Sequence, residues 1–186
     1  MTLYGDCLFT TRLHLKRPTR EDLLLIADWS HSPEACGPYL SCENLDPEQL
    51  YDQLKSGAMW NDKEKRFIIC RNGLPIGSIR YWTPCGQLNT AMISVKVAVP
   101  SHRGKGFGTE AQKFLIKHLM ENENIHQIHM YTDINNTSQQ RCLRKLGFEA
   151  KEALRYHDQN LLRDGLLFIL TLENFRRQPI YRYHNE

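Results

Sequence analysis

Two spacings of apolar residues divide the chain into expected strands and helices. In Thr10–Arg17, Leu13 and Leu15 alternate with charged neighbours, which is typical of a half-buried strand. Spacings of three and four residues predict helices instead. Strands are predicted at residues 10–17, 66–70, 75–82, 90–99, 125–133, 148–156 and 165–172. Helices are predicted at residues 20–29, 48–55, 106–121 and 136–146.

Capping and turn residues indicate where these elements begin and end. Thr19 and Asp22 form a capping-box pattern before the first helix, and Asp46, followed by a proline, precedes the second. Asn72 and Gly73 are typical of a tight hairpin turn between two strands. The resulting order, β-α-α-β-β-β-α-β-α-β-β, predicts an α/β fold, a mixed sheet with helices on both faces.

The most informative stretch links a predicted strand to a predicted helix. Strand residues Val95–Val99 lead through Pro100 into the basic, glycine-spaced loop Arg103–Gly108. The first N–H groups of a helix lack partners and carry partial positive charge, and glycines let a ligand approach the backbone. Arg103 and Lys105 add full charges. The loop therefore predicts a binding site for an anion such as a diphosphate.

The glycine spacing of this loop excludes two common nucleotide-binding motifs. A G-x-G-x-x-G fingerprint would need its third glycine at Thr109, and no G-x-x-x-x-G-K-[ST] run occurs in the chain. What remains is the string R-x-x-G-x-G, from Arg103 to Gly108.

A second run, from Asn136 to Phe148, has an ordered spacing of its own. Asn136 is suited to cap a helix, Leu143 lies on the apolar face of that helix, and Gly147 is suited to end it. The interval of eleven residues from Asn136 to the Gly-Phe pair is the feature that an ordinary helix does not require.

Together, these two runs resemble the motifs of the GNAT-type N-acetyltransferases. The first resembles the acetyl-CoA pyrophosphate loop, and the second resembles the pattern N-x-x-S-x-R-x-x-x-K-x-G-F. The string T-x-R-L-x-L-K-R-P-T-x-E-D at residues 10–22 and FIICRNGLPIGSI at 67–79 resemble the RimJ/RimL-like branch of ribosomal-protein-alanine acetyltransferases. The resemblance implies one N-acetyltransferase domain at residues 10–172 and a C-terminal tail at 173–186.

The resemblance also implies a cosubstrate, acetyl-CoA, and a site for it. In a mostly antiparallel sheet, two parallel strands ending at Val99 and Asp133 would splay apart around the cosubstrate. Main-chain groups would bind the pantetheine arm and polarise the acetyl carbonyl, and loop N–H groups would hold the pyrophosphate. The implied cofactor-binding residues are Val97, Val99, Arg103, Gly104, Lys105, Gly106, Phe107, Gly108, Thr109 and Asn136.

Proton-transfer residues do not carry over, because the chain departs from the family at two positions. Many relatives have a carboxylate on the strand before the loop, and Ala91–Val99 contains none. Many have a tyrosine four residues before the Gly-Phe pair, where this chain has Leu143. Ser138 remains as a candidate catalytic acid. Asp133 is a second candidate, although a turn residue is its simpler interpretation.

Further candidates lie elsewhere along the chain. His157 and Asp158 are a candidate His–Asp pair for a catalytic base, although their place in a predicted hairpin turn is the simpler explanation for both residues. His102 is expected at the surface. Four aromatic residues are candidates for the lining of an acceptor pocket, and the alternative is that they belong to the core. They are Tyr39, Trp60, Tyr81 and Trp82. Four carboxylates are candidates to attract the ammonium group of an acceptor, and the alternative is that they are only solvated. They are Asp28, Glu34, Glu43 and Asp62.

Composition limits the class of protein without adding a site. A chain of 186 residues with 41% hydrophobic and 24% charged residues is typical of one soluble domain. Neither an apolar run of membrane-spanning length nor a signal peptide is evident, so a cytoplasmic protein is expected. A net charge of +3 gives no reason to expect nucleic acid as a partner. The six cysteines show no metal-binding spacing and are expected to be free thiols.

The leading functional hypothesis is acetyl transfer from acetyl-CoA to a primary amine. A small-molecule acceptor, which needs an enclosed pocket, is favoured over a protein N-terminal amine, which needs an open groove. The two departures from the family leave a non-catalytic acyl-CoA-binding module as an alternative from another class, and a nucleotide-binding α/β protein is a third. The protein is expected to be a monomer or a homodimer.

Overall fold

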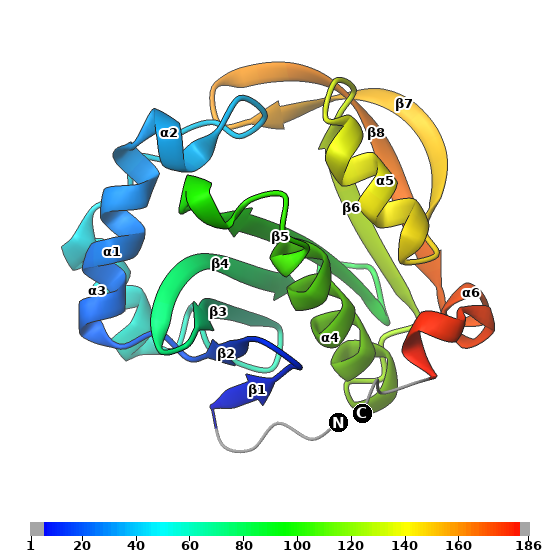
Figure 1. Cartoon of the computed structure of the whole chain (residues 1–186), viewed down its shortest axis with the longest axis horizontal. Helices are drawn as coiled ribbons and strands as arrows, with labels where there is room; N and C mark the ends of the chain where they lie inside the picture. Colours follow the sequence, from blue (N-terminus) through cyan, green and yellow to red (C-terminus); the bar gives the residue numbers. More distant parts are fainter. Residues whose placement is uncertain (1–5, 183–186) are drawn as a thin grey trace.

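The computed structural model describes residues 6–182 and contains strands, α-helices and short 3-10 turns (Figure 1). The strands are β1 (Cys7–Phe9), β2 (His14–Lys16), β3 (Glu64–Arg71), β4 (Leu74–Trp82), β5 (Thr90–Val97), β6 (Gln127–Asp133), β7 (Glu149–Asp158) and β8 (Leu161–Thr171). The helices are α1 (Arg20–His31), α2 (Pro33–Cys36), α3 (Pro47–Ser56), α4 (Phe107–Asn122), α5 (Thr137–Lys145) and α6 (Leu172–Arg177), with 3-10 turns η1 (Pro100–His102) and η2 (Pro179–Tyr181).

Within the described part of the chain, the strands form one sheet in the order β1-β2-β3-β4-β5-β6-β8-β7. The pair β5 and β6 is parallel, and the other neighbouring pairs are antiparallel. The prediction of a mixed, mostly antiparallel sheet in an α/β fold is therefore confirmed. Among residues 6–182, no helix is both long enough and apolar enough to span a bilayer.

Two apolar cores lie on opposite faces of the sheet, because side chains alternate along each strand. On β3, Phe67 and Ile69 belong to the larger core, which also contains the apolar residues of α4 and α5. Ile68 and Cys70 point the other way and pack with residues of α1 and α3. Helices thus cover both faces (Figure 1), and the space between α1 and the sheet is separate from the space beneath α4.

The strands β5 and β6 separate after a short parallel stretch. They pair only from Thr90 to Met92, opposite Gln127 to His129. Beyond this point β5 continues beside β4, and β6 continues beside β8 as far as Asp133. The N–H groups of Ala98 and Val99 both donate to the carbonyl of Ile76, at 2.9 and 3.2 Å, which is a β-bulge that bends the end of β5. The predicted splayed pair is present.

The first predicted strand is only partly correct. Residues 10–17 contain the short strand β2, but Thr10 lies in the turn of a hairpin between β1 and β2. There the Thr10 N–H donates to the Leu13 carbonyl at 2.9 Å, and the Thr10 side chain accepts a hydrogen bond from the Leu13 N–H at 2.8 Å. This local bonding competes with an extended strand, and alternation of apolar residues does not reveal it.

The segment after residue 172 is packed rather than a loose polar tail. It forms α6 and η2, and Phe175 and Tyr181 are buried in the larger core. The Tyr181 hydroxyl donates to the Leu146 carbonyl at 2.8 Å, which ties this segment to the end of α5. Residues 183–186 of the predicted tail lie outside the described residues, and the domain boundary at residue 172 stays a prediction.

Candidate active site

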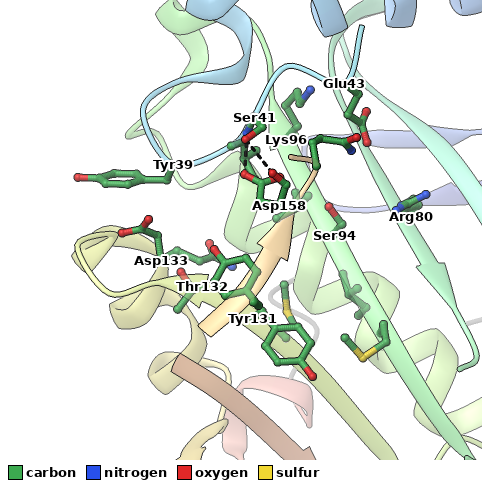
Figure 2. Close-up of a pocket in the computed structure, with 18 of the residues that line it drawn as sticks. Tyr39, Ser41, Glu43, Arg80, Ser94, Lys96, Tyr131, Thr132, Asp133 and Asp158 are labelled. Atoms are coloured by element: carbon green, nitrogen blue, oxygen red, sulfur yellow. Dashed lines mark hydrogen bonds between the residues drawn. The ribbon is translucent and has the colours of Figure 1, made fainter. Parts of the chain in front are cut away.

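A cavity of about 630 Å³ opens where β5 and β6 separate (Figure 2). It extends from the splayed strands to the space between α1 and the sheet. Its lining includes β5 residues Met92–Lys96, β6 residues Met130–Asp133, the segment Tyr39–Ser41 with Glu43, and the end of β7. Asn136 and Gln139, at the start of α5, lie on the same cavity. The sheet itself therefore builds the cavity, because two strands that would normally pair are held apart.

The basic loop at the end of β5 has the backbone of an anion site. Gly104 and Gly106 have φ values of 71° and 82°, which side chains rarely allow. Gly106 is the N-cap of α4 and offers no side chain, and the first helical bond runs from the Glu110 N–H to its carbonyl at 2.9 Å. The N–H groups of Phe107, Gly108 and Thr109 precede that first bond and are available to an anion.

The Arg103 side chain does not face this anion site, contrary to the charge role that the sequence suggested. Its guanidinium donates to four main-chain carbonyls. The acceptors are Val97 at 2.8 Å, Glu34 at 2.8 Å, Ala35 at 2.8 Å and Ala98 at 3.2 Å. Arg103 therefore joins α2 to the bulged end of β5, and only its backbone remains for a ligand.

Several predicted ligand groups already have partners inside the protein. The Val97 carbonyl accepts from Arg103, and the Val99 N–H donates into the bulge. Phe107 is buried, with the guanidinium carbons of Arg12 and Arg71 each 4.6 Å from its ring centroid. The predictions for these residues concern their main chains and stay predictions. Lys105 is exposed, which leaves its ammonium group accessible.

Glutamine side chains connect the loop to the start of α5. Gln112, which is buried, donates to the Gly108 carbonyl at 3.0 Å and accepts from Gln139 at 2.8 Å. The Gln139 N–H in turn donates to the Asn136 side chain at 3.1 Å. Gln139 also lines the cavity. Its position in the cavity wall and its bond to Gln112 could not be inferred from spacing.

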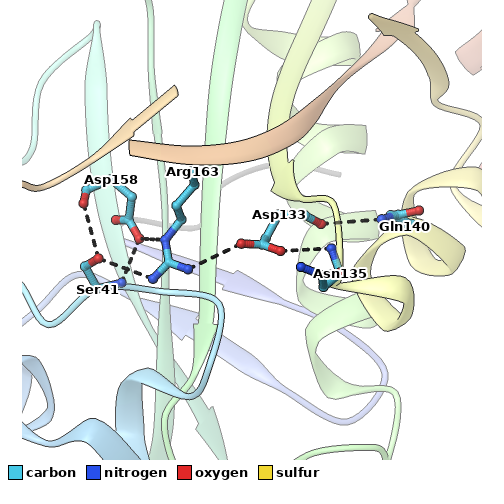
Figure 3. Close-up of polar contacts among 6 residues, drawn as sticks. All are labelled: Ser41, Asp133, Asn135, Gln140, Asp158 and Arg163. Carbon is cyan, nitrogen blue, oxygen red and sulfur yellow. Dashed lines mark hydrogen bonds and ion pairs between the residues drawn. The ribbon is translucent and has the colours of Figure 1, made fainter. Parts of the chain in front are cut away.

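Asp133 serves as a turn and ion-pair residue (Figure 3). Its carboxylate accepts from the Asn135 N–H at 2.8 Å and from Arg163 at 3.3 Å. Arg163 also donates to Asp158 at 2.7 Å and contacts the Ser41 hydroxyl at 3.4 Å. Although burial lowers the pKa of Arg163, the hydrogen bonds and charges of these carboxylates raise it overall. Because the Asp133 carboxylate is held by a turn N–H and by Arg163, the geometry favours the simpler interpretation of Asp133 as a turn residue.

Ser138 lies on the exposed side of α5 and does not line the cavity, so its candidacy as the acid gains no support from its position. Leu143 is fully buried. Tyrosines from other elements line the cavity, namely Tyr39, Tyr131 and Tyr156. The rings of Tyr131 and Tyr156 stack at 5.7 Å, and burial raises the pKa of Tyr156.

The predicted acceptor-site residues divide into those that line the cavity and those that do not. Of the aromatic residues, Tyr39 and Trp82 line the cavity. Tyr81 is buried in the larger core and Trp60 packs against that core. His157 lines the cavity, whereas His102 lies in η1 beside Phe107, with ring centroids 6.0 Å apart.

Glu43 differs from the other carboxylates in the acceptor list because it lines the cavity. Asp28, Glu34 and Asp62 are exposed and do not. Within residues 6–182, no hydrogen bond or ion pair occupies the Glu43 carboxylate. Asp133 and Asp158, in contrast, are both paired with Arg163. Glu43 is therefore the cavity carboxylate that is free to meet a ligand.

Comparison with known proteins identifies both the domain and the fold. A family model described as an acetyltransferase (GNAT) domain matches residues 12–149, which is most of the chain. The matched segment contains the anion loop, and it also contains the splayed strands and the start of α5, which line the cavity.

Solved structures with the same fold come from several acetyltransferases. Mycobacterium smegmatis RimJ in complex with CoA-disulfide aligns with a TM-score of 0.79 and 20% identity, covering 96% of this chain and 93% of its own. A chimera of the spermidine N-acetyltransferase SpeG from Vibrio cholerae and hSSAT gives 0.76 and 18%, covering 90% and 99%. AAC(6')-Ib in complex with paromomycin and acetyl-CoA gives 0.71 and 20%, covering 90% and 98%.

Proposed function

The chain belongs to the GNAT acetyltransferase family, and from this premise we propose that it transfers the acetyl group of acetyl-CoA to a primary amine of a small molecule. Similar folds act on different acceptors, including spermidine in SpeG. The choice among acceptors therefore has to come from this chain's own cavity.

The segment that crosses the acceptor end of the cavity supports the choice of a small molecule. The segment Tyr39–Glu43 crosses from α2 to the far end of the β7–β8 hairpin (Figure 1). There the Ser41 N–H donates to the Asp158 carboxylate at 2.8 Å, and the Ser41 hydroxyl donates to the Asp158 carbonyl at 3.2 Å. Arg163 also donates hydrogen bonds to both Ser41 and Asp158, so its side chain is a further link that holds the crossing segment to the hairpin. An N-terminal peptide would need an open groove at this place.

The anion loop supports acetyl-CoA as the cosubstrate. Gly106 places the free N–H groups of Phe107–Thr109 at the end of β5, which suits a pyrophosphate. The pantetheine arm then extends along the separated β5 and β6, toward the polar end of the cavity.

The reaction requires alignment of the amine with the thioester and two proton transfers, and it does not require a nucleophilic side chain. A deprotonated amine attacks the thioester carbonyl, a C–N bond forms, and the C–S bond breaks. We assign Glu43 as the base that takes the ammonium proton directly or through water, because its carboxylate has no competing partner in the described chain. A tyrosine hydroxyl of the cavity wall, or water, returns a proton to the sulfur.

Release of free thiol from acetyl-CoA tests this function, with a panel of small amines and N-terminal peptides as acceptors. We expect turnover that depends on a small amine, with the N-acetylated product identified by mass spectrometry. Turnover on peptides alone would indicate a protein N-terminal acetyltransferase. Tight acetyl-CoA binding with no turnover on any acceptor would indicate a non-catalytic module, which the absence of a β5 carboxylate and the presence of Leu143 would then explain.

A further inference from the structure

Basic and hydroxyl side chains form one continuous row on the sheet face that closes the acceptor end of the cavity. Arg66 on β3 lies directly opposite Arg80 on β4, and Arg80 lies opposite Ser94 on β5. Two residues along the strands, on the same face, Ser78 lies opposite Lys96. All five residues line the cavity, and Figure 2 shows Arg80, Ser94 and Lys96 near Glu43. We call this set the cationic row.

Arg66 is the residue of this row whose side chain is least satisfied by hydrogen bonds and ion pairs. Its guanidinium has no hydrogen bond or ion pair within residues 6–182, and its Nε is buried and unsatisfied. Burial lowers the pKa of Arg66 and the charge of Arg80 lowers it further, and these two effects outweigh the opposing charges of Glu43 and Glu64. Like charges directly opposite each other on neighbouring strands are unfavourable. A desolvated, unpaired cation is equally unfavourable, so two arginines in this position indicate a site that an anion completes.

The protein's own anions neutralise the row only in part. Arg80 approaches Glu64 only at 3.7 Å, and the nearest polar partner of Lys96 is the Cys36 sulfur at 3.8 Å. The carboxylates of Asp133 and Asp158 are committed to Arg163. Among the described cavity residues, Glu43 is thus the one unpaired carboxylate facing the three cations.

We propose that the acceptor amine carries a compact anionic group, a carboxylate or a phosphate, which binds to Arg66, Arg80 and Lys96 while its ammonium group meets Glu43. This inference rests on the proposed function, because it names the class of acceptor for the same cavity. Planar guanidinium groups bind carboxylate and phosphate oxygens in pairs, and Ser78 and Ser94 supply hydroxyl donors between the cations. A polyamine, in contrast, would place positive charge against positive charge.

A matched acceptor series tests the class directly. The probes are an α-amino acid, its uncharged amide, a phosphorylated amino sugar, the unphosphorylated sugar, and spermidine. We expect kcat/KM for the better anionic probe to exceed that of its uncharged counterpart by at least about 10-fold, with spermidine poorest. The amino acid and the sugar phosphate distinguish carboxylate from phosphate. Equal turnover of charged and uncharged members, or a preference for spermidine, would overturn the inference.

Variants separate recognition by the row from a structural role. Arg66→Gln should lower kcat/KM for the anionic probe by about 10- to 100-fold, mainly through KM, and leave the uncharged probe unchanged. Arg80→Glu should reverse the preference toward spermidine. Arg177→Gln, at an arginine that is 70% exposed and distant from the cavity, is the control and should change neither.

Thermal stability gives an independent readout. If Arg66 serves to bind an anionic ligand, the ligand-free Arg66→Gln variant should have a melting temperature equal to or above that of the wild-type protein. The reason is that the substitution removes an unpaired, desolvated charge. A lower melting temperature together with equal losses for charged and uncharged probes would assign Arg66 to structure and overturn the inference. Turnover of uncharged amines alone would contradict the inference and leave the proposed function intact, whereas CoA binding without any turnover would contradict the function itself.

Discussion

The anion loop at the start of α4 and the cationic row on the sheet face are both proposed to bind anions, but by opposite means. The loop uses main-chain N–H groups that a helix leaves free, and its one arginine side chain is turned away into the protein. The row uses side chains from three strands, and its most buried arginine has no hydrogen bond or ion pair within residues 6–182. The loop is therefore complete without its ligand, whereas the row is not.

The largest effect should come from breaking the loop. Gly106→Val places a side chain at a φ of 82° and puts a Cβ where the ligand must approach, 3.4 Å from Arg12. We expect acetyl-CoA affinity, measured by calorimetry, to fall at least about 1,000-fold, because several charge-assisted hydrogen bonds are lost together. Gly73→Val, at a similar φ of 78° in a distant open turn, is the matched control and should retain affinity.

The acceptor half should respond next, through Glu43. Glu43→Gln keeps the size of the side chain but removes the proposed base, so kcat near neutral pH should fall about 100-fold while the KM for acetyl-CoA is unchanged. Steady-state thiol release measures both quantities. Glu34→Gln changes an exposed carboxylate on α2 and is the control. Unchanged kcat in Glu43→Gln would remove Glu43 as the base.

Arg103 tests how the two halves are joined. Arg103→Met removes bonds to four carbonyls in α2 and β5, and we expect the free energy of unfolding to fall by about 3 kcal/mol in urea denaturation. Acetyl-CoA affinity of the folded variant should fall less than about tenfold, because the side chain faces the protein. A large loss of affinity with unchanged stability would instead place the Arg103 charge in the ligand site.

Glu110 gives the smallest effect and has a defined pH dependence. Burial raises its pKa, but hydrogen bonds from the Thr10 hydroxyl at 2.6 Å and from Arg12 outweigh burial and bring the pKa below its usual range. Its contribution to the free energy of unfolding should thus be complete above the unfolded-state pKa of about 4.3, and be lost as pH falls through the lower folded value.

In Glu110→Gln, the wild-type stability advantage should therefore be greatest near neutral pH and disappear in acid, as measured by urea denaturation between about pH 3 and 7. Glu173→Gln, at an exposed ion pair in α6, should show little difference at any pH. A variant whose deficit stays constant across this pH range would show that packing, and not charge, is the contribution of Glu110.

The sequence indicates the anion loop but not the cationic row, for a physical reason. The anion loop depends on glycines and a helix start within six consecutive residues, so its spacing is visible in the chain. The cationic row depends on strand register, which places Arg66 opposite Arg80 across a hairpin, and on which face of the sheet each side chain takes. Apolar periodicity indicates the face of a strand but not the register of its partners.

Individual residues show the same limit. Thr19, Asp46 and Asn136 cap helices as predicted, because capping is a local property. The direction of the Arg103 side chain depends on α2, far away in the chain, and the exposure of Ser138 depends on how α5 turns relative to the cavity. Glu43 appeared among four carboxylates with nothing in the sequence to separate it, and only the cavity does so.

A bisubstrate conjugate, in which CoA is joined through an acetyl bridge to the nitrogen of an anionic amine, tests most directly whether loop and row form one active site. If they do, calorimetry should show that the wild-type protein binds the conjugate at least about 100-fold more tightly than CoA alone. Arg66→Gln should abolish that advantage and leave CoA affinity unchanged. Equal affinity of the wild-type protein for the conjugate and for CoA would contradict the account, because the two halves would then not hold both reactants together.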